Sequence, residues 1–374
     1  TLKNFTIGYS CKYNELYQEL KRRGFKEEEI LASSLVIKNE DGSYVDRFRK
    51  RFMIPIRDIK DRVIAFGGRV LDDSKPKYIN TGDTPVYKKG RELFALNLAK
   101  NGNNGKLILC EGYMDVIALH QAGYENAVST SGTALTPEQV SLISRYADEV
   151  ALCFDSDEAG QKAVRAALAL FSKTGVKIKV IKLSGGKDPD EIIRVHGKEM
   201  FAKLLNQADN DTEYKLSKLR EKFPTATDDG KINFLREAVK VLAFTDALER
   251  DVYAMRLADE LGVSKEAIMQ QINSVNKKEQ YKKAKNELAD AQKQAKELEK
   301  AVDPQRIKNV RAAKAEDTIL ISLLNNGAFY KKVKDKLSSD LFVTTVNKRI
   351  LEVITERLEK DESVDITYLS QYLT

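Results

Sequence analysis

The sequence predicts an α/β chain whose centre is a parallel sheet flanked by helices, preceded by a basic α+β segment and followed by helices. Three observations support this fold class. Short apolar runs alternate with helical patterns between residues 106 and 182, which is typical of parallel sheets with helices on both faces. Basic residues concentrate before that region, and apolar residues recur at helical spacing after it.

The central sheet is expected to contain four short strands. These apolar runs are Lys106–Cys110, Asn126–Ser129, Val150–Phe154 and Val176–Lys182. Helical patterns occupy Asp115–Gln121, Thr136–Arg145 and Ala159–Lys173. Thr136 is a good helix start because it is followed by a proline in the first turn and a glutamine three residues on.

Acidic side chains gather after three of the expected strands, directly after two of them and a few residues after the last. They are Glu111 and Asp115 after the first strand, Asp155 and Asp157 after the third, and Asp188 and Asp190 after the fourth. In a parallel sheet such positions meet at one edge, where ligands bind. Crowded carboxylates repel one another unless a cation holds them, and their oxygen atoms suit Mg²⁺ or Mn²⁺. The sequence therefore predicts a divalent-metal site made of these six residues.

Each acidic pair has a plainer explanation when it is taken alone. An Asp-x-Asp after a strand is usually a solvated turn or a helix cap, and Asp157 stands where it would cap the next helix. Asp188-Pro189-Asp190 alone would be an ordinary turn. The combination of three clusters in one alternating region favours the metal site.

Basic residues concentrate just before this region. From Gly42 to Arg91 there are 13 lysines and arginines against six aspartates, an excess that equals the net charge of +7 for the whole chain. A local positive stretch beside an acidic metal site suits an anionic polymer and triphosphates. For any single residue here, an ordinary solvated strand face is an equal alternative.

The acidic pattern resembles a known domain. Glu-Gly follows one strand, Asp-x-Asp-x-x-Gly follows a later one, and a third Asp-x-Asp comes after that. This arrangement resembles the TOPRIM domain that bacterial primases share with type IA and type II topoisomerases and with certain nucleases and recombination proteins.

Four blocks upstream narrow the resemblance. In order they are Arg47–Ile56, Val63–Arg69, Lys75–Thr81 and Tyr87–Leu93. Together with Glu111-Gly112-Tyr113-Met114-Asp115 they resemble the RNA polymerase domain of bacterial replicative DNA primases, over roughly residues 1–274. The resemblance implies a nucleotidyltransferase that makes short RNA primers on single-stranded DNA from ribonucleoside triphosphates, in the bacterial cytoplasm at the replication fork.

The resemblance also assigns roles to residues. The expected catalytic residues are Glu111, Asp155 and Asp157, with Asp115, Asp188 and Asp190 completing the acidic surround of the metal. The residues that match the family's nucleotide-binding positions are Lys77, Asn80, Lys89 and Arg91. The candidates for the template groove are Arg47, Arg49 and Arg51.

We expect five segments along the chain. They are a basic α+β subdomain (1–105), the TOPRIM metal-binding subdomain (106–205), a helical subdomain (206–275), a charged linker or helix (276–310) and a helical bundle (311–374). The charged segment has alternating charges and little to bury. The final bundle resembles the start of the domain through which primases bind the replicative helicase, which is therefore an expected partner.

The helical subdomain carries two further patterns. Ile232, Leu235, Val239 and Leu242 recur at helical spacing and predict one stripe that faces the core. Arg256–Ile268 has the pattern of a helix–turn–helix, which either reads the major groove or packs within the subdomain. Its second helix lacks a clear set of Arg, Asn or Gln for base edges, which favours packing.

Other observations limit the chemistry. The three cysteines form no Cys-x-x-Cys pair, so no zinc site is expected from this sequence, although primases normally carry a zinc-binding domain before the region where it starts. The sequence starts at Thr1 and is expected to be a fragment. No apolar run is long enough for a membrane span, so no membrane association is expected.

Two alternatives to a primase stay open. One is a TOPRIM topoisomerase or nuclease fragment, but a topoisomerase needs a tyrosine nucleophile in a DNA-cleavage domain, and none is recognisable around the 15 tyrosines. The other is a non-catalytic module that docks a helicase, against which the complete acidic set argues.

Overall fold

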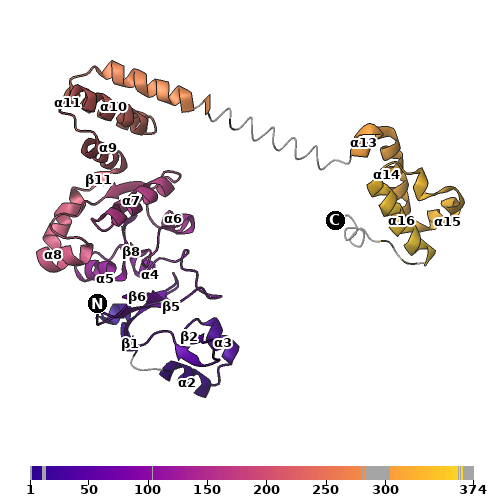
Figure 1. The fold of residues 1–374 in the computed structure, drawn as a ribbon, viewed down its shortest axis with the longest axis horizontal. Helices are drawn as coiled ribbons and strands as arrows, with labels where there is room; N and C mark the ends of the chain where they lie inside the picture. Colours follow the sequence, from indigo (N-terminus) through magenta and orange to yellow (C-terminus); the bar gives the residue numbers. More distant parts are fainter. Residues whose placement is uncertain are drawn as a thin grey trace. The chain divides into compact units, whose positions relative to one another are not determined.

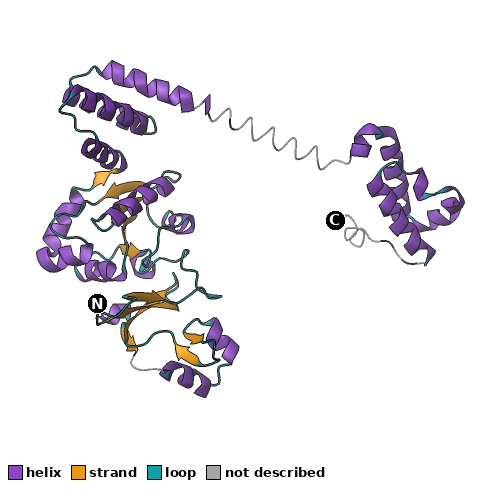
Figure 2. Cartoon of the chain, viewed as in Figure 1, coloured by secondary structure: helices purple, strands orange, loops and turns teal. Residues whose placement is uncertain are grey.

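The structure is a computed structural model that describes residues 2–10, 14–102, 104–279, 281–282, 286, 304–360, 362 and 364. The chain divides into two compact units, residues 1–272 and 273–374 (Figures 1 and 2). Most of the expected charged segment 276–310 lies outside the described residues. Within the described ranges, we find no helix long and apolar enough to cross a lipid bilayer.

Unit 1 begins with a four-stranded antiparallel sheet in the order β1–β4–β5–β6. Its strands are β1 (Gly8–Ser10), β4 (Arg51–Arg57), β5 (Val63–Val70) and β6 (Tyr78–Asn80). The same region contains α1 (Leu2–Phe5), α2 (Glu15–Arg22), α3 (Glu27–Ala32), β2 (Val36–Lys38) and β3 (Tyr44–Asp46). Ile54 and Ile56 of β4 and Ala65 of β5 are buried in a core shared with the second sheet, so the two sheets are held together.

The second sheet has five strands in the order β11–β10–β9–β7–β8. Its strands are β7 (Lys106–Cys110), β8 (Ala127–Ser129), β9 (Glu149–Cys153), β10 (Lys177–Val180) and β11 (Asp209–Asn210). The strands are parallel except for β11, which pairs antiparallel with β10. This matches the four strands expected from the apolar runs and adds a short fifth.

Helices cover both faces of the second sheet. They are α4 (Leu96–Ala99), α5 (Tyr113–Gln121), α6 (Pro137–Ile143), α7 (Glu158–Phe171) and α8 (Pro189–Asn206). Residues of α5 and α8 pack with one set of alternate strand residues, and residues of α6 and α7 pack with the other set. Burial on both faces explains why the strands are apolar throughout. The predicted fold class is confirmed.

Three more helices belong to unit 1: α9 (Asp211–Lys222), α10 (Asp228–Leu242) and α11 (Ala247–Leu261). A further helical stretch, residues 265–279, begins in unit 1 and continues past its end at residue 272. The expected stripe on α10 needs a correction, because Ile232 is exposed, whereas Phe234 and Ala238 are buried. The buried row therefore starts two residues later than predicted. In the helix–turn–helix pattern, Leu257, Leu261 and Ile268 are buried, which fits a packing role.

Unit 2 is a small helical bundle. Its elements are α13 (Pro304–Lys308), α14 (Val310–Asn325), η1 (Gly327–Phe329), α15 (Tyr330–Val333), η2 (Lys334–Lys336), η3 (Ser339–Leu341) and α16 (Thr345–Glu359). The core joins Leu320 and Leu323 of α14 to Leu351 and Ile354 of α16. Buried Glu316 accepts hydrogen bonds from the backbone N–H and hydroxyl of Thr344, which fixes the start of α16.

Candidate active site

The acidic residues lie at the carboxyl edge of the parallel sheet. Cys110 at the end of β7 pairs in register with Cys153 at the end of β9, and both are buried. Glu111 and Asp155 follow these strand ends and lie next to each other. The backbone N–H of Asp155 donates to Glu111 Oε1 over 3.1 Å. The register of the sheet thus brings Glu111 and Asp155, which are 44 residues apart in sequence, next to each other.

Asp157 has the capping role that its sequence position allowed. Its Oδ1 accepts a hydrogen bond of 2.8 Å from the Gly160 backbone N–H and starts α7. A Cβ added at Gly160 would lie 2.0 Å from the carbonyl oxygen of Asp155. Only glycine fits there, which gives the Asp-x-Asp-x-x-Gly spacing a steric reason. The cap holds Asp157 beside Asp155.

The third acidic cluster forms the start of α8. Asp188 Oδ1 accepts from the Glu191 backbone N–H over 2.7 Å, and a proline follows in the first turn. The backbone N–H of Ser156 donates to the Lys187 carbonyl over 2.9 Å. The loop after β9 and the loop before α8 are therefore tied together, which holds the second and third clusters next to each other.

Asp115 is almost fully buried at the centre of the acidic group. Its carboxylate accepts from the backbone N–H of Gly112 at 3.1 Å and from that of Asp190 at 3.4 Å. Burial, together with the nearby carboxylates of Asp155 and Asp188, raises the pKa of Asp115 to about 7. Burial and neighbouring carboxylates also raise the pKa of Asp155 to about 6. Without a cation, this group resists full ionisation at neutral pH.

Nine of the predicted site residues line one cleft of about 580 Å³ between the two sheets. These nine are Glu111, Asp115, Asp155, Asp157, Asp188, Asp190, Lys77, Asn80 and Lys89. The cleft is also lined by Tyr78, which the sequence offered as a candidate for stacking on a base, and by Arg69 and Lys187, which were not singled out from the sequence. Lys187 could have been suspected because it directly precedes the third acidic cluster. The acidic edge of one sheet thus faces basic residues from the other.

Asn80 is held inside this cleft by both ends of its side chain. Its Oδ1 accepts from the Tyr113 hydroxyl over 2.8 Å, and its Nδ2 donates to the Ser131 carbonyl over 3.1 Å. A Cβ added at Gly67 would lie 2.8 Å from the Tyr113 ring, so glycine is needed for this close approach. Asn80 therefore links the basic sheet to the acidic one.

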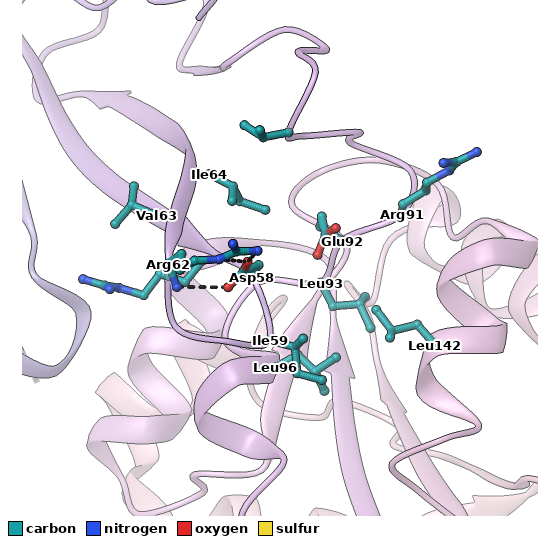
Figure 3. Close-up of a pocket in the computed structure, with 12 residues that line it drawn as sticks. Asp58, Ile59, Arg62, Val63, Ile64, Arg91, Glu92, Leu93, Leu96 and Leu142 are labelled. Carbon is teal, nitrogen blue, oxygen red and sulfur yellow. Dashed lines mark hydrogen bonds and ion pairs between the residues drawn. The ribbon is translucent and has the colours of Figure 1, made fainter.

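Arg91 lies apart from the other expected nucleotide residues. It lines a separate, mainly apolar hollow of about 540 Å³ with Asp58, Glu92, Leu93 and others, and its side chain points away from that hollow (Figure 3). Its neighbour Lys89 faces the acidic cleft, where burial lowers the pKa of the Lys89 ammonium group.

The three arginines expected at the template groove line one surface hollow with Lys50 and Lys75. Arg49 is exposed, and Arg47 donates to the Asn80 carbonyl over 2.9 Å. Arg51 is buried, and its guanidinium donates to the carbonyl oxygens of Gly68, Pro76 and Lys77. Its side chain supports the β5–β6 connection.

The acidic residues offer the type of ligand atom, oxygen, that a divalent cation of this kind requires. Carboxylate oxygens are the ligands that Mg²⁺ and Mn²⁺ prefer. Burial, together with repulsion between the carboxylates, raises the pKa values of Asp115 and Asp155, and a bound cation would oppose both effects. Among the described residues, however, no three His, Cys, Asp or Glu side chains converge closely enough to hold one ion by themselves. Mg²⁺ is commonly held by one or two carboxylates with phosphate and water, so a complete protein cage is not required.

Four family models match successive parts of the chain. "DNA primase catalytic core, N-terminal domain" matches residues 1–100, and "Toprim-like" matches residues 108–193. "DnaB-helicase binding domain of primase" matches residues 212–266, upstream of the bundle in which the sequence suggested helicase binding. "DnaB-like helicase N terminal domain" matches residues 308–374.

Individual proteins and solved structures agree with these matches. The chain is 35% identical over 361 residues to a DNA primase of Clostridium acetobutylicum, which covers 95% of this chain and 58% of that protein. The chain is similar, at 37% identity and a TM-score of 0.61, to a DNA primase domain from Pseudomonas aeruginosa, covering 73% of this chain and 88% of that one. It is also similar to the RNA polymerase domain of a Mycobacterium tuberculosis primase in complex with DNA, at 30% identity and a TM-score of 0.62, covering 70% and 86% of the two chains.

A Toprim sheet with an acidic edge, joined to a basic antiparallel sheet, defines this chain as a primase-type catalytic core of the kind that depends on divalent metal. The chain belongs to the family of DnaG-type bacterial DNA primases. It spans about half of the length of the DNA primases that it matches, from 46% to 58% in three of them.

Proposed function

We propose that this chain is the catalytic core of a DNA primase, which makes short RNA primers on single-stranded DNA from ribonucleoside triphosphates. One observation carries the proposal: a single cleft brings the six carboxylates of the parallel sheet opposite Lys77, Lys89 and Arg69. Such a cleft suits a metal-bound triphosphate, because carboxylates hold the cation and the basic side chains hold phosphate oxygens.

The reaction joins the 3′-hydroxyl oxygen of the primer to the α-phosphorus of the next nucleotide. The bond from that phosphorus to the bridging oxygen breaks, pyrophosphate leaves, and the hydroxyl loses its proton. The nucleophile belongs to the nucleotide, so no nucleophilic side chain is needed. Bound Mg²⁺ or Mn²⁺ would lower the pKa of the hydroxyl and neutralise charge on the phosphates. The residues proposed to hold the cation are Glu111, Asp155 and Asp157, with Asp115, Asp188 and Asp190 around them.

The basic wall of the cleft has a separate role in the proposal. Lys77 and Lys89 bind the triphosphate, and Arg69 and Lys187 are added from their places in the cleft. The exposed ring of Tyr78 can stack on a base. Arg91 lines a different hollow, and its side chain points away from that hollow, so we propose that Arg91 contributes less to nucleotide binding. Asn80 acts by positioning the two walls.

The template strand is proposed to follow the basic hollow lined by Arg47, Arg49 and Lys50. Its location next to the cleft, with Ile79 lining both, supports this path. Arg51 serves the groove by supporting its wall, since its donors are taken up by three carbonyl groups.

The proposed protein partner and the proposed localisation of this chain follow from its family. A match to the helicase-binding model at residues 212–266 supports binding of a DnaB-type replicative helicase. We propose that the protein acts at the replication fork in the bacterial cytoplasm, in association with the nucleoid.

Three assays on the same preparation separate the candidate functions. The first assay tests primer synthesis on single-stranded DNA with labelled ribonucleotides, in the presence of Mg²⁺ or of EDTA. The second measures plasmid relaxation, which tests the topoisomerase alternative. The third measures cleavage of labelled DNA, which tests the nuclease alternative. We expect labelled RNA only when Mg²⁺ is present, with the plasmid and the DNA unchanged. Plasmid relaxation or DNA cleavage without RNA synthesis would contradict the proposal and indicate a topoisomerase or a nuclease. Helicase binding without any of the three activities would indicate a docking module.

A further inference from the structure

One stretch of the bundle in unit 2 combines an exposed aromatic ring with a cluster of lysines. Three short helical elements, η1, α15 and η2, follow one another between residues 327 and 336. Four of the six residues from Lys331 to Lys336 are lysines, and Asp335 is the one acidic residue among them. Phe329 lies just before this cluster, and 44% of its surface is exposed.

One side of this stretch holds it in the bundle. Tyr330 is buried, and its hydroxyl donates to Glu359 Oε1 over 3.0 Å. Val333 and Leu337 pack against the same core. The three residues are spaced by three and four, which places them on one side of a helix. This buried row fixes which side of the stretch faces solvent.

Phe329, Lys332 and Lys336 make up the neighbouring side of the stretch, which we call the aromatic–lysine face. Each of them stands one residue before a member of the buried row, and one residue corresponds to a rotation of about 100° around a helix. They are also spaced by three and four, so the ring and the two ammonium groups lie along one face. All three side chains are exposed.

The lysines of this face are not neutralised within the described part of the chain. Other cations of the bundle have carboxylate partners, namely Arg306, Lys348, Arg357 and Lys360. Neither Lys332 nor Lys336 forms an ion pair with any residue that the structure describes. Exposed lysines alone are an ordinary solvated surface, so the ring that shares their face is what distinguishes it.

We propose that the aromatic–lysine face of unit 2 binds single-stranded DNA. Lysines bind the phosphate groups of the strand, and an exposed ring stacks on a base, which is the combination that sequence-tolerant single-strand binders use. The centre of a protein interface is depleted in lysine and rich in apolar side chains, whereas lysines outnumber the one exposed ring here. The composition therefore favours a nucleic acid over a protein partner.

The inference rests on the proposed function for the identity of the strand, since single-stranded DNA is the template of a primase. It goes beyond that function because it gives the template a contact outside the catalytic cleft. Units 1 and 2 belong to one chain, so two weak contacts on the same strand combine into tighter binding than either provides alone. The face thus retains the template while the cleft exchanges nucleotides.

The test measures the affinity of the full 374-residue chain for labelled single-stranded DNA, without nucleotides and over a range of salt concentrations. Lys332→Ala combined with Lys336→Ala should lower the slope of log affinity against log salt by roughly 1.4, because each phosphate contact contributes roughly 0.7. Arg311→Ala combined with Lys314→Ala is the matched control. Both residues are exposed cations of α14, a helix that contains no aromatic residue.

A second set of variants tests the ring. Phe329→Leu should weaken the affinity for DNA at least about fivefold, whereas Phe329→Tyr should retain it, because stacking requires an aromatic ring. Phe244→Leu is the control, since Phe244 in the α10–α11 turn is 71% exposed. The nearby Arg250 donates to the carbonyl oxygens of Leu242 and Thr245, so this ring has no comparable cation beside it.

The expected result is a lower slope and a weaker affinity in the Lys332/Lys336 and Phe329→Leu variants alone, with wild-type unfolding temperatures and wild-type primer synthesis at saturating DNA. Unchanged DNA binding in these variants overturns the inference. An equal fall of slope in both double variants also overturns it, because net charge alone would then explain the effect.

Two further binding measurements exclude other occupants of the face. Weaker binding of single-stranded RNA, or of the purified N-terminal domain of a DnaB-type helicase, with unchanged affinity for DNA would identify a different ligand and overturn the inference. The catalytic proposal is tested separately on the same preparation. A wild-type chain that binds DNA through this face but makes no RNA would refute the catalytic proposal and leave the DNA contact standing.

Discussion

The Tyr113 hydroxyl donates a hydrogen bond of 2.8 Å to Asn80 Oδ1, across the boundary between the two sheets of unit 1. Asn80 ends β6 of the basic sheet, and Tyr113 begins α5 directly after Glu111 and Gly112. The second bond of Asn80, to the Ser131 carbonyl, reaches the loop after β8. The spacing between the basic and acidic walls of the cleft therefore depends on this side chain.

Tyr113→Phe is expected to weaken nucleotide use as well as stability. Loss of the bond to Asn80 should cost about 1 kcal/mol of unfolding free energy, and the loosened cleft should raise the KM for nucleotides severalfold. Tyr253→Phe is the matched control, since the Tyr253 hydroxyl also donates to an asparagine Oδ1, that of Asn210, far from the cleft. Thermal unfolding and steady-state primer synthesis measure both effects. If the KM for nucleotides rose equally in both variants, the hydrogen bond to Asn80 would have no specific role in nucleotide use and would only stabilise the fold.

Gly160→Ala should inactivate the cleft by displacing Asp155. The added Cβ would stand 2.0 Å from the Asp155 carbonyl oxygen, so the loop that carries Asp155 and Asp157 has to move. We expect a loss of roughly 10²-fold or more in primer synthesis, the scale on which misplacement of a catalytic group acts. Gly175→Ala is the control, because nothing lies within 4 Å of a Cβ at Gly175. Equal activity of the two variants would contradict the assignment of this loop to the active site.

The basic residues should divide into two groups by ligand. Lys77→Ala and Lys89→Ala are expected to weaken triphosphate binding more than DNA binding, because both line the acidic cleft. Arg49→Ala should do the reverse and lower the slope of log affinity against log salt for single-stranded DNA by roughly 0.7. Fluorescence anisotropy with labelled nucleotide and labelled DNA measures both. Similar losses for both ligands in all three variants would show that the division is wrong.

Arg51→Ala is expected to act on stability instead of salt dependence. The buried guanidinium donates to three carbonyl oxygens of the β5–β6 region, so its removal takes away these three hydrogen bonds and costs on the order of 2 kcal/mol. A lower unfolding midpoint with an unchanged salt slope is the expected outcome. A changed slope with unchanged stability would return Arg51 to the set of direct DNA contacts.

Metal-free protein should lose stability as the pH rises from about 4 to about 7. The pKa of Asp115 is raised to about 7 in the fold, so its contribution to stability is fully present below its ordinary pKa and is lost as pH passes through about 7. Asp155, at about 6, adds to the same trend. Unfolding in EDTA should show this fall, Asp115→Asn should flatten it, and Mg²⁺ should restore stability at pH 8. A wild-type profile that Asp115→Asn leaves unchanged would contradict the crowding of carboxylates.

The central sheet and its acidic edge were predictable because local pattern determines them. Strands buried on both faces are continuous apolar runs, and their carboxyl ends must meet at one edge, so Glu111 and Asp155 could be brought together from sequence alone. The structure also agrees with Thr136 as a helix start, since its hydroxyl accepts from the Gln139 backbone N–H.

Other features depend on contacts between distant segments and were not predictable from local pattern. Arg51 looks like its neighbours in sequence, but pairing of β4 with β5 turns its side chain toward the Pro76 turn and buries it. Phe234 replaces Ile232 in the core because the packing direction of α10 is set by its partner helices. Lys89 and Arg91 are two residues apart and line different hollows. This difference depends on how their loop lies on α6, where the Gln139 side chain donates to the Glu92 carbonyl.

The most direct test of the account is primer synthesis by Glu111→Gln beside Glu149→Gln. Glu111 lies at the carboxyl end of β7 in the acidic cleft, whereas Glu149 begins β9 at the opposite edge and pairs with Lys106 and Lys179. On single-stranded DNA with ribonucleotides and Mg²⁺, we expect the rate of primer synthesis by Glu111→Gln to fall about 10²–10³-fold, while the fold and the DNA affinity of the variant are unchanged. Glu149→Gln should keep the wild-type rate. Near-normal primer yield from Glu111→Gln would contradict the assignment of the acidic edge as the catalytic metal site.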